Sequence, residues 1–131
     1  MMKVEITGTK NFQYHAVIEQ IVADFCRVFG LTRNEDILEI NFVSSAKIRQ
    51  LNSRFLGKDY ATDVLSFPQS DSPARRKIYG TIVISKTIAL KKNIKIEELV
   101  KHGLLHLKGF DHEKNQSQWR TAALKINHQM F

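Results

Sequence analysis

The sequence predicts an α/β (α+β) fold in which helices pack on a single mixed sheet of four strands. Segments that alternate every second residue, as strands do, are interleaved with segments whose apolar residues recur every 3.6 residues, as in amphipathic helices. The resulting order is strand, helix, strand, helix, strand, strand and then helices. The length of 131 residues suits one core, so we expect a single domain over residues 1–131.

The first half of the chain is expected to contain two strand–helix pairs. Apolar residues recur along one face of the first predicted helix, and Gly30 follows it as a stop signal. Ser44 or Ser45 can cap the second helix, which is expected to end near Gly57. The expected elements are a strand over 2–6, a helix over 12–29, a strand over 37–43 and a helix over 45–56.

The second half is expected to contain two strands followed by three helices. Pro68 has no amide hydrogen and should end the first of these strands, whereas Ser85 should open the first helix. Residues 69–77 (QSDSPARRK) form a polar and basic loop, and loops of that length are often functional. The expected elements are strands over 63–67 and 78–84 and helices over about 86–93, 96–108 and 115–129.

The chain is basic, because 20 Lys and Arg residues against 13 Asp and Glu residues give a net charge of +7. This excess is typical of proteins that bind a polyanion but also serves solubility, and composition leaves both open. Cys26 is the only cysteine, so no intrachain disulfide can form, and its apolar neighbours favour a buried thiol. Residues 1–12 contain no long apolar stretch, so we expect a cytoplasmic protein without a signal peptide or membrane span.

Three histidines carry the main chemical hypothesis. His102 and His106 are i and i+4, so on a helix their imidazoles lie on one face, one turn apart. Gly109 ends that helix and lets the chain turn, which allows His112 to swing back as a third ligand. Three imidazoles leave a fourth tetrahedral position open, which is typical of catalytic zinc, although the same ligands also accept nickel, copper or cobalt.

The alternative is that these histidines are ordinary surface or core residues of a helix. On a helical wheel, Glu97, Lys101 and Lys108 form a narrow charged stripe. The two histidines of this helix lie away from that stripe, beside Leu99 and a broad apolar face. Two unligated imidazoles on a largely buried helix would be costly, so the pattern favours a metal site.

The residue after His102 bears on whether the predicted metal site could catalyse peptide hydrolysis. The spacing H-x-x-x-H-x-x-G-x-x-H is that of the metzincin proteases, which carry a glutamate general base at this position. Here the position holds Gly103, which cannot transfer a proton. The sequence therefore argues against ordinary zinc peptidase chemistry.

Two long motifs resemble those of the YbeY family of bacterial rRNA-maturation endoribonucleases. Residues 102–112 (HGLLHLKGFDH) are similar to the family's H-G-x-L-H-L-x-G-[YF]-D-H. Residues 51–68 (LNSRFLGKDYATDVLSFP) are similar to its L-N-x-x-[FY]-x-G-x-D-x-x-T-[DN]-V-L-S-F-P. Residues 80–85 (GTIVIS) look like its G-D-I-x-I-S strand, so the resemblance extends over nearly the whole chain.

The resemblance implies a zincin-like fold, one zinc ion on His102, His106 and His112, and hydrolysis of single-stranded RNA. It further implies ribosomal RNA as substrate, including 3′-end processing of 16S rRNA, a part in ribosome quality control, and contact with small-subunit proteins and an assembly GTPase. Two positions depart from the family pattern. Some members carry arginine before the glycine of G-x-D, where this chain has Leu56, and the usual acid of G-D-I is Thr81 here.

Several other residues are candidates for contact with RNA or with the metal ligands. Arg54 is a candidate catalytic residue that would bind phosphate, and an ordinary exposed helix arginine is its alternative. Asp111 could orient a ligand histidine by accepting a hydrogen bond, or could be a turn residue. Further candidate RNA contacts are Lys58, Ser66, Arg75, Arg76, Lys77, Lys91 and Lys92, with Phe67 and Tyr79 as candidates for base stacking, although Phe67 is more simply a core residue.

Three classes of function remain. The leading hypothesis is a metal-dependent endoribonuclease of ribosome biogenesis. The second is a ribosome assembly or RNA-binding factor in which zinc is chiefly structural, and Leu56 keeps this class open. The third is a peptidase or other small-substrate metallohydrolase, against which Gly103 and the charge of +7 argue.

Overall fold

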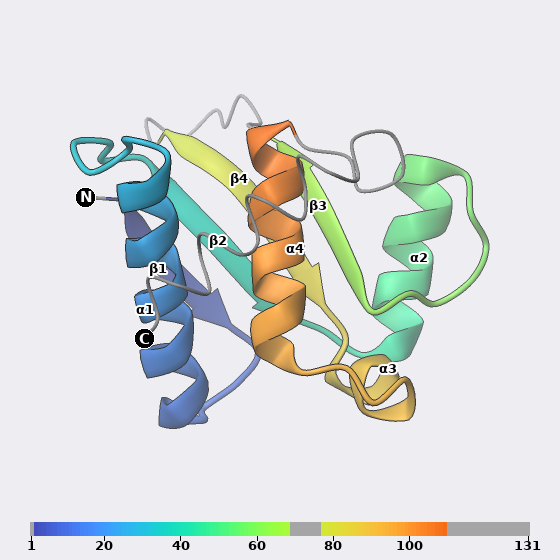
Figure 1. The fold of residues 1–131 in the computed structure, drawn as a ribbon. Coiled ribbons are helices and arrows are strands. Elements are labelled where there is room, and N and C mark those ends of the chain that lie inside the picture. The colour runs from blue at the N-terminus through green and yellow to red at the C-terminus, as the bar shows by residue number, and fades with distance from the viewer. Residues whose placement is uncertain (1, 69–76, 110–131) are drawn as a thin grey trace.

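The computed structural model describes residues 2–68 and 77–109. Helices lie against one continuous sheet, and the two longest, α1 and α4, run side by side across it (Figure 1). The elements in chain order are β1 (Lys3–Thr7), α1 (Phe12–Val28), β2 (Ile37–Phe42), α2 (Ser45–Leu56), β3 (Val64–Pro68), β4 (Ile78–Ile84), α3 (Lys86–Lys91) and α4 (Ile96–Lys108).

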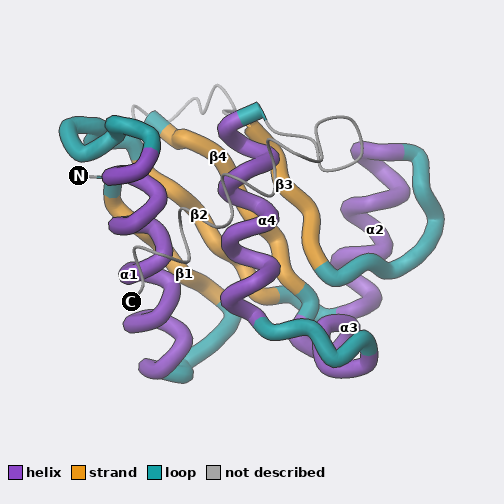
Figure 2. The backbone as a smooth tube through the Cα atoms, in the orientation of Figure 1, coloured by secondary structure: helices purple, strands orange, loops and turns teal. Residues whose placement is uncertain are grey.

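The sheet contains four strands in the order β1-β2-β4-β3. β1 and β2 are parallel, as are β2 and β4, whereas β3 runs antiparallel to β4 at one edge. The backbone trace shows the three parallel strands followed by the edge strand beside α4 (Figure 2). The predicted class, an α/β (α+β) fold with one mixed four-stranded sheet, is confirmed.

The main core lies between the sheet and the pair α1 and α4. Alternate residues of the strands face these helices, as the period of a strand requires. Each fully buried aliphatic or aromatic side chain contributes about 1.5–3 kcal/mol to folding. The buried residues of this core include Ile18, Ile21, Phe25, Leu38, Ile40, Ile82, Ile84, Val100, Leu104 and Leu105.

A smaller cluster lies on the reverse face near the β3 edge. Leu65 and Val83 point away from α4, because they alternate with residues that face it, and Ile48 of α2 packs on them. Helix α2 therefore covers the part of the reverse face formed by β3 and β4. This position brings the C-terminal end of α2 next to the edge strand.

Helix ends follow the predicted capping signals. Ser44, rather than Ser45, caps α2 by accepting a hydrogen bond from the amide of Lys47 at 3.1 Å. Ser85 caps α3 in the same way through the amide of Ile88 at 3.3 Å. Gly109 ends α4 with a φ of 103°, a left-handed conformation that favours glycine.

Some predicted boundaries are wrong by one or two residues. β1 begins at Lys3 rather than at residue 2, and α3 ends at Lys91 rather than near residue 93. Pro68 belongs to β3, opposite Gly80, although it was expected to end the strand. β3 is an edge strand, so one side has no neighbouring strand and a missing amide hydrogen there costs no ladder bond. The helix expected over 115–129 lies outside the described residues.

Two further expectations concern burial and membrane insertion. Cys26 is fully buried, as expected, and this burial raises the pKa of its thiol. None of the helices in the described part of the chain is long and apolar enough to cross a membrane.

Candidate metal centre and nucleic-acid cleft

An open cleft of about 680 Å³ lies where α4 passes the edge strand β3. Its walls come from the C-terminal half of α4, from β3, from the end of α2 and from the loop that joins α2 to β3. The residues that line it are Asn52, Leu56, Lys58, Tyr60, Thr62, Asp63, Val64, Leu65, Ser66, Pro68, Lys92, His102, His106 and Leu107.

The two histidines of α4 converge in this cleft. Their Nε2 atoms are 3.0 Å apart, and the ring centroids are 4.6 Å apart. Both side chains are partly buried, so each is held by the protein on one side and reaches the cleft on the other. The i, i+4 spacing thus produces the convergence that the sequence predicts for a shared ligand.

This arrangement fits a zinc ion. Two ligands of a tetrahedral zinc, each at about 2.0–2.1 Å, have donor atoms about 3.3 Å apart, close to the observed Nε2 separation. Within residues 2–68 and 77–109, no group of three or more His, Cys, Asp or Glu side chains is gathered to hold a metal. His112, the predicted third ligand, and Asp111, the residue predicted to orient a ligand histidine, lie outside the described residues.

Gly103 allows α4 to approach the sheet closely. A Cβ atom added at Gly103 would lie 2.8 Å from Cδ1 and 2.9 Å from both γ-carbons of Ile82 in β4. A glutamate here would therefore be directed into the sheet rather than into the cleft. Packing of α4 on β4 thus requires a residue without a side chain at position 103, and this requirement also excludes a protease-type glutamate there.

Ser66 connects the edge strand to α4. Its hydroxyl donates a hydrogen bond to the carbonyl of Gly103 at 3.4 Å. Ser66 also lines the cleft, so the strand that forms one wall is attached to the helix that carries both histidines. The predicted contact of Ser66 with RNA stays a prediction.

Lys101 lies in a different environment from the one predicted. The helical wheel placed it on a solvated charged stripe, but it is only 6% exposed, so that part of the prediction is wrong. Its Nζ is 3.0 Å from Oε1 of Glu98, one turn earlier on α4. Together with His102 and Asp63, this pair lines a second hollow of about 250 Å³ next to the cleft. Neighbouring elements cover this side of α4, which a single-helix wheel cannot represent.

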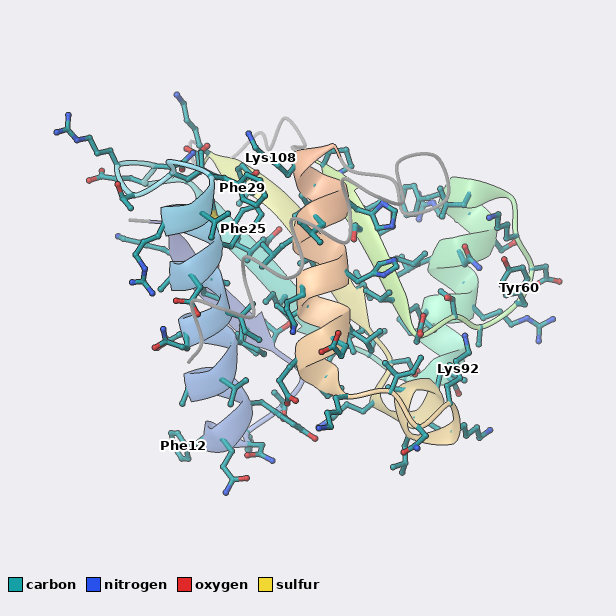
Figure 3. The ribbon with its side chains drawn as sticks, viewed as in Figure 1. Phe12, Phe25, Phe29, Tyr60, Lys92 and Lys108 are labelled. Carbon is teal, nitrogen blue, oxygen red and sulfur yellow. The ribbon has the colours of Figure 1, made fainter. Side chains whose placement is uncertain are left out.

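Two lysines supply positive charge to the histidine cleft. Lys58 lies just after the end of α2, and Lys92 lies just after α3; both line the cleft. Lys92 is 3.9 Å from a carboxylate oxygen of Asp63. In the stick view, Lys92 lies near α3, and Tyr60 lies on the loop beside α2 (Figure 3). Lys91, the other half of the predicted pair, does not line the cleft.

Arg54 is not brought to the histidines. It lines a separate depression of about 440 Å³ along α2, and its guanidinium carbon lies 5.3 Å from the centroid of the Phe55 ring. Leu56, which occupies the position of the family arginine, does line the histidine cleft. The structure therefore separates the two positions, and a phosphate-binding role of Arg54 stays a prediction.

The loop between α2 and β3 is attached to α2 at two adjacent residues. The carboxylate of Asp59 accepts hydrogen bonds from Nε and Nη2 of Arg49 at 2.9 and 3.3 Å, and these bonds hold its pKa below the usual range. Asn52, 2% exposed, donates from Nδ2 to the carbonyl of Tyr60 at 2.9 Å. The backbone that forms this wall of the cleft is thereby held in place.

The remaining candidates lie elsewhere. Lys77 is exposed just before β4 and does not line the cleft, while Arg75 and Arg76 lie outside the described residues. Phe67 and Tyr79 are partly buried against the core clusters. Thr81 donates a hydrogen bond to Glu39 at 2.9 Å within the sheet, away from the cleft.

Sequence reasoning missed the roles of Asn52 and Tyr60. Asn52 falls on the same helical face as apolar residues, which is a signal of a buried polar group with a specific partner. Tyr60 is an aromatic residue in an otherwise polar loop segment, GKDY, and no periodicity assigned it to the core. Both line the cleft.

The fold and the site define a class: an α/β domain with two convergent imidazoles on one helix, in a cleft at the sheet edge that also contains two lysines. The chain belongs to the YbeY family, because the family model described as Endoribonuclease YbeY matches residues 2–128.

Individual relatives agree with this assignment. Proteins named Endoribonuclease YbeY include one from Campylobacter fetus that is 35% identical over 128 residues, which is 92% of this chain and 88% of the relative. One from Helicobacter pylori (strain G27) is 42% identical over 69% of this chain and 68% of the relative. One from Anaeromyxobacter sp. is 38% identical over 71% of this chain and 53% of the relative. The chain thus spans about half the length of the Anaeromyxobacter relatives that it matches.

A solved structure has a similar fold. The solution structure of TM1509 from Thermotoga maritima superposes with a TM-score of 0.56 and 25% sequence identity, covering 96% of this chain and 89% of that one.

Proposed function

We propose that this chain is a zinc-dependent endoribonuclease that cuts single-stranded RNA and takes part in ribosomal RNA maturation. The observation that supports this most directly is the pair of imidazole nitrogens, 3.0 Å apart, in a cleft that Lys58 and Lys92 also line. Relatives named Endoribonuclease YbeY support the type of reaction. The net charge of +7 supports a polyanionic substrate.

The proposed role of each residue follows from the chemistry of its side chain. His102, His106 and, by prediction, His112 would hold the zinc as neutral nitrogen donors. When bound, zinc would supply activation of water and stabilisation of charge on the phosphoryl oxygens. Lys58 and Lys92 would bind the phosphates on either side of the scissile bond, and Ser66 would keep the edge strand against α4.

The wider assignment is also a proposal. The substrate would be ribosomal RNA, with the 3′ end of 16S rRNA as the processing site. The partners would be small-subunit ribosomal proteins and an assembly GTPase, and the protein would act in the cytoplasm. The basic charge and the open cleft are compatible with access to an RNA strand on a large assembly.

The proposal can be tested by measuring metal content and RNA cleavage together. Wild-type protein should contain about one zinc per chain and should cleave a single-stranded RNA, and chelation should abolish cleavage until zinc is restored. His106→Ala should lose most of the metal and nearly all activity. His15→Ala is the matched control, because His15 lies on α1 and does not line the cleft. Cleavage at full rate by His106→Ala would refute the mechanism.

A second candidate function is a zinc-containing RNA-binding assembly factor with little catalysis. It is favoured by Leu56, an aliphatic residue that lines the cleft where some family members are expected to carry arginine. In that case the protein would bind RNA and zinc, chelation would unfold it, and no cleavage would be detected before chelation.

A further inference from the structure

We propose that Tyr60 forms a nucleobase-stacking subsite at the outer wall of the histidine cleft. The ligand would be an unpaired base of the single-stranded RNA whose phosphates bind near the histidines. This inference rests on the proposed function, because it supplies the part of the substrate that the metal and the lysines do not contact.

The exposure of the aromatic residues singles out Tyr60. Among the residues that the structure describes, the large exposed aromatic side chains are Phe12, Phe55 and Tyr60. Phe12 lies at the start of α1, distant from the cleft (Figure 3). Phe55 packs edge-on against Phe67, with centroids 5.4 Å apart, and is not part of the cleft wall. Of the three, only Tyr60 lines the cleft that contains the histidines.

The backbone that presents Tyr60 is held in place. Its carbonyl accepts the hydrogen bond from the buried side chain of Asn52, and the preceding residue, Asp59, is paired with Arg49. These contacts restrain the main chain, while Tyr60 as a whole remains 54% exposed. An exposed ring on a restrained backbone loses little conformational freedom when a base stacks on it.

The neighbours of Tyr60 suit a nucleotide. Leu56, which is 54% exposed, adds apolar surface to the same wall. Lys58 lies two residues away and Lys92 lies on the adjoining part of the cleft, so positive charge is available for the phosphates that flank a stacked base. An aromatic face next to ammonium groups is the usual composition of a single-strand binding surface.

The subsite would also contribute to strand selectivity. A base can offer its face to Tyr60 only if it leaves the stack of a duplex, and that requires unstacking and unpairing. For a base in single-stranded RNA, the free-energy cost of unstacking and unpairing is smaller. Preference for single strands would then originate partly at Tyr60, separately from the step of bond cleavage.

The test measures binding apart from cleavage. A short single-stranded RNA that contains 2-aminopurine reports stacking by loss of fluorescence, and rapid mixing records binding before the strand is cut. A second strand with the same phosphates but abasic sugars in the central positions reports contacts to the backbone only. The variants are Tyr60→Ala and Tyr60→Phe, with Phe55→Ala as the matched control for an exposed aromatic outside the cleft.

Tyr60→Ala should weaken binding of the base-containing strand roughly 5- to 150-fold, the range of one base–aromatic stack, and should abolish the fluorescence loss. Tyr60→Phe and Phe55→Ala should bind like wild type, and all four proteins should bind the abasic strand equally. Equal affinity of Tyr60→Ala and wild type for the base-containing strand would overturn the subsite. An equal loss on both strands would overturn stacking in favour of a backbone contact.

These experiments distinguish failure of the stacking subsite from failure of the proposed endoribonuclease activity. If wild type shows the fluorescence loss, Tyr60→Ala abolishes it and wild type never cleaves RNA, the endoribonuclease proposal fails and the stacking subsite stands. If wild type cleaves RNA but Tyr60→Ala retains its KM, the subsite fails and the endoribonuclease proposal stands.

Discussion

At the scale of single residues, the direction of each side chain decides its role in the 51–68 motif. Leu56 and Lys58 line the histidine cleft, whereas Arg54 lines the neighbouring depression of α2 and stacks on Phe55. The sequence offers Arg54 as a candidate phosphate-binding residue, with an ordinary exposed helix arginine as the alternative. The geometry instead favours Lys58 as the phosphate contact near the histidines.

Separate substitution of Arg54 and of Lys58 by alanine tests which of the two side chains binds phosphate. Lys58→Ala should raise the KM for single-stranded RNA. It should also reduce the slope of the logarithm of the binding constant against the logarithm of salt concentration by the amount that corresponds to about one phosphate contact. Arg54→Ala should leave both nearly unchanged, because its side chain lies outside the cleft. The measurement is a set of initial rates and binding constants at several salt concentrations. A larger effect of Arg54→Ala than of Lys58→Ala would restore the sequence-based hypothesis.

At the scale of elements, the approach of α4 to β4 positions the histidines. Gly103 lies directly over Ile82, and Gly80 lies under Leu107, where a Cβ would be 2.6 Å from the leucine side chain. Because neither glycine has a side chain, the side chains of Ile82 and Leu107 pack directly on the facing backbone and the helix lies close to the strand. The edge strand is then joined to the same helix by Ser66.

A double-mutant cycle tests this packing. Gly103→Ala should lower the free energy of unfolding by about 1–3 kcal/mol, because the added methyl group overlaps the Ile82 side chain. Ile82→Ala alone should cost about 2–5 kcal/mol by leaving a cavity in the core. The double variant should be less destabilised than the sum, because the new methyl occupies space that Ile82 vacates. Chemical denaturation measures all three values, and strict additivity would contradict the contact.

At the scale of the whole molecule, the basic charge and the open cleft would act together in the proposed function. The excess of positive charge would raise the local concentration of a polyanion, and the cleft would direct it to the imidazole pair. The charge alone is compatible with solubility as its only purpose. The presence of two lysines on the wall of the histidine cleft favours a specific use.

Binding of single-stranded RNA should therefore weaken with salt. With two phosphate contacts, at Lys58 and Lys92, the logarithm of the binding constant should fall with the logarithm of salt concentration with a slope of about −1.4 or steeper, from about −0.7 per contact. Titration by fluorescence anisotropy between about 50 and 200 mM salt measures the slope. A binding constant that does not change over this range would show that the lysines do not contact phosphate.

The sequence alone determined the features that depend on neighbours along the chain. Strand and helix periods, serine caps and the glycine that ends α4 are local, so the class of fold and most boundaries could be predicted within one or two residues. The convergence of His102 and His106 is also local, because the pitch of one helix sets it.

Only the tertiary structure decided which side chains share the cleft. Whether Arg54, Leu56 or Lys58 faces the histidines depends on how α2 lies against β3. The burial of Lys101 depends on the elements that pack around α4. The role of Gly103 in helix–sheet packing depends on Ile82, which lies 21 positions earlier in the sequence (103 − 82). Such contacts join residues distant in sequence, and no periodic pattern in a single chain encodes them.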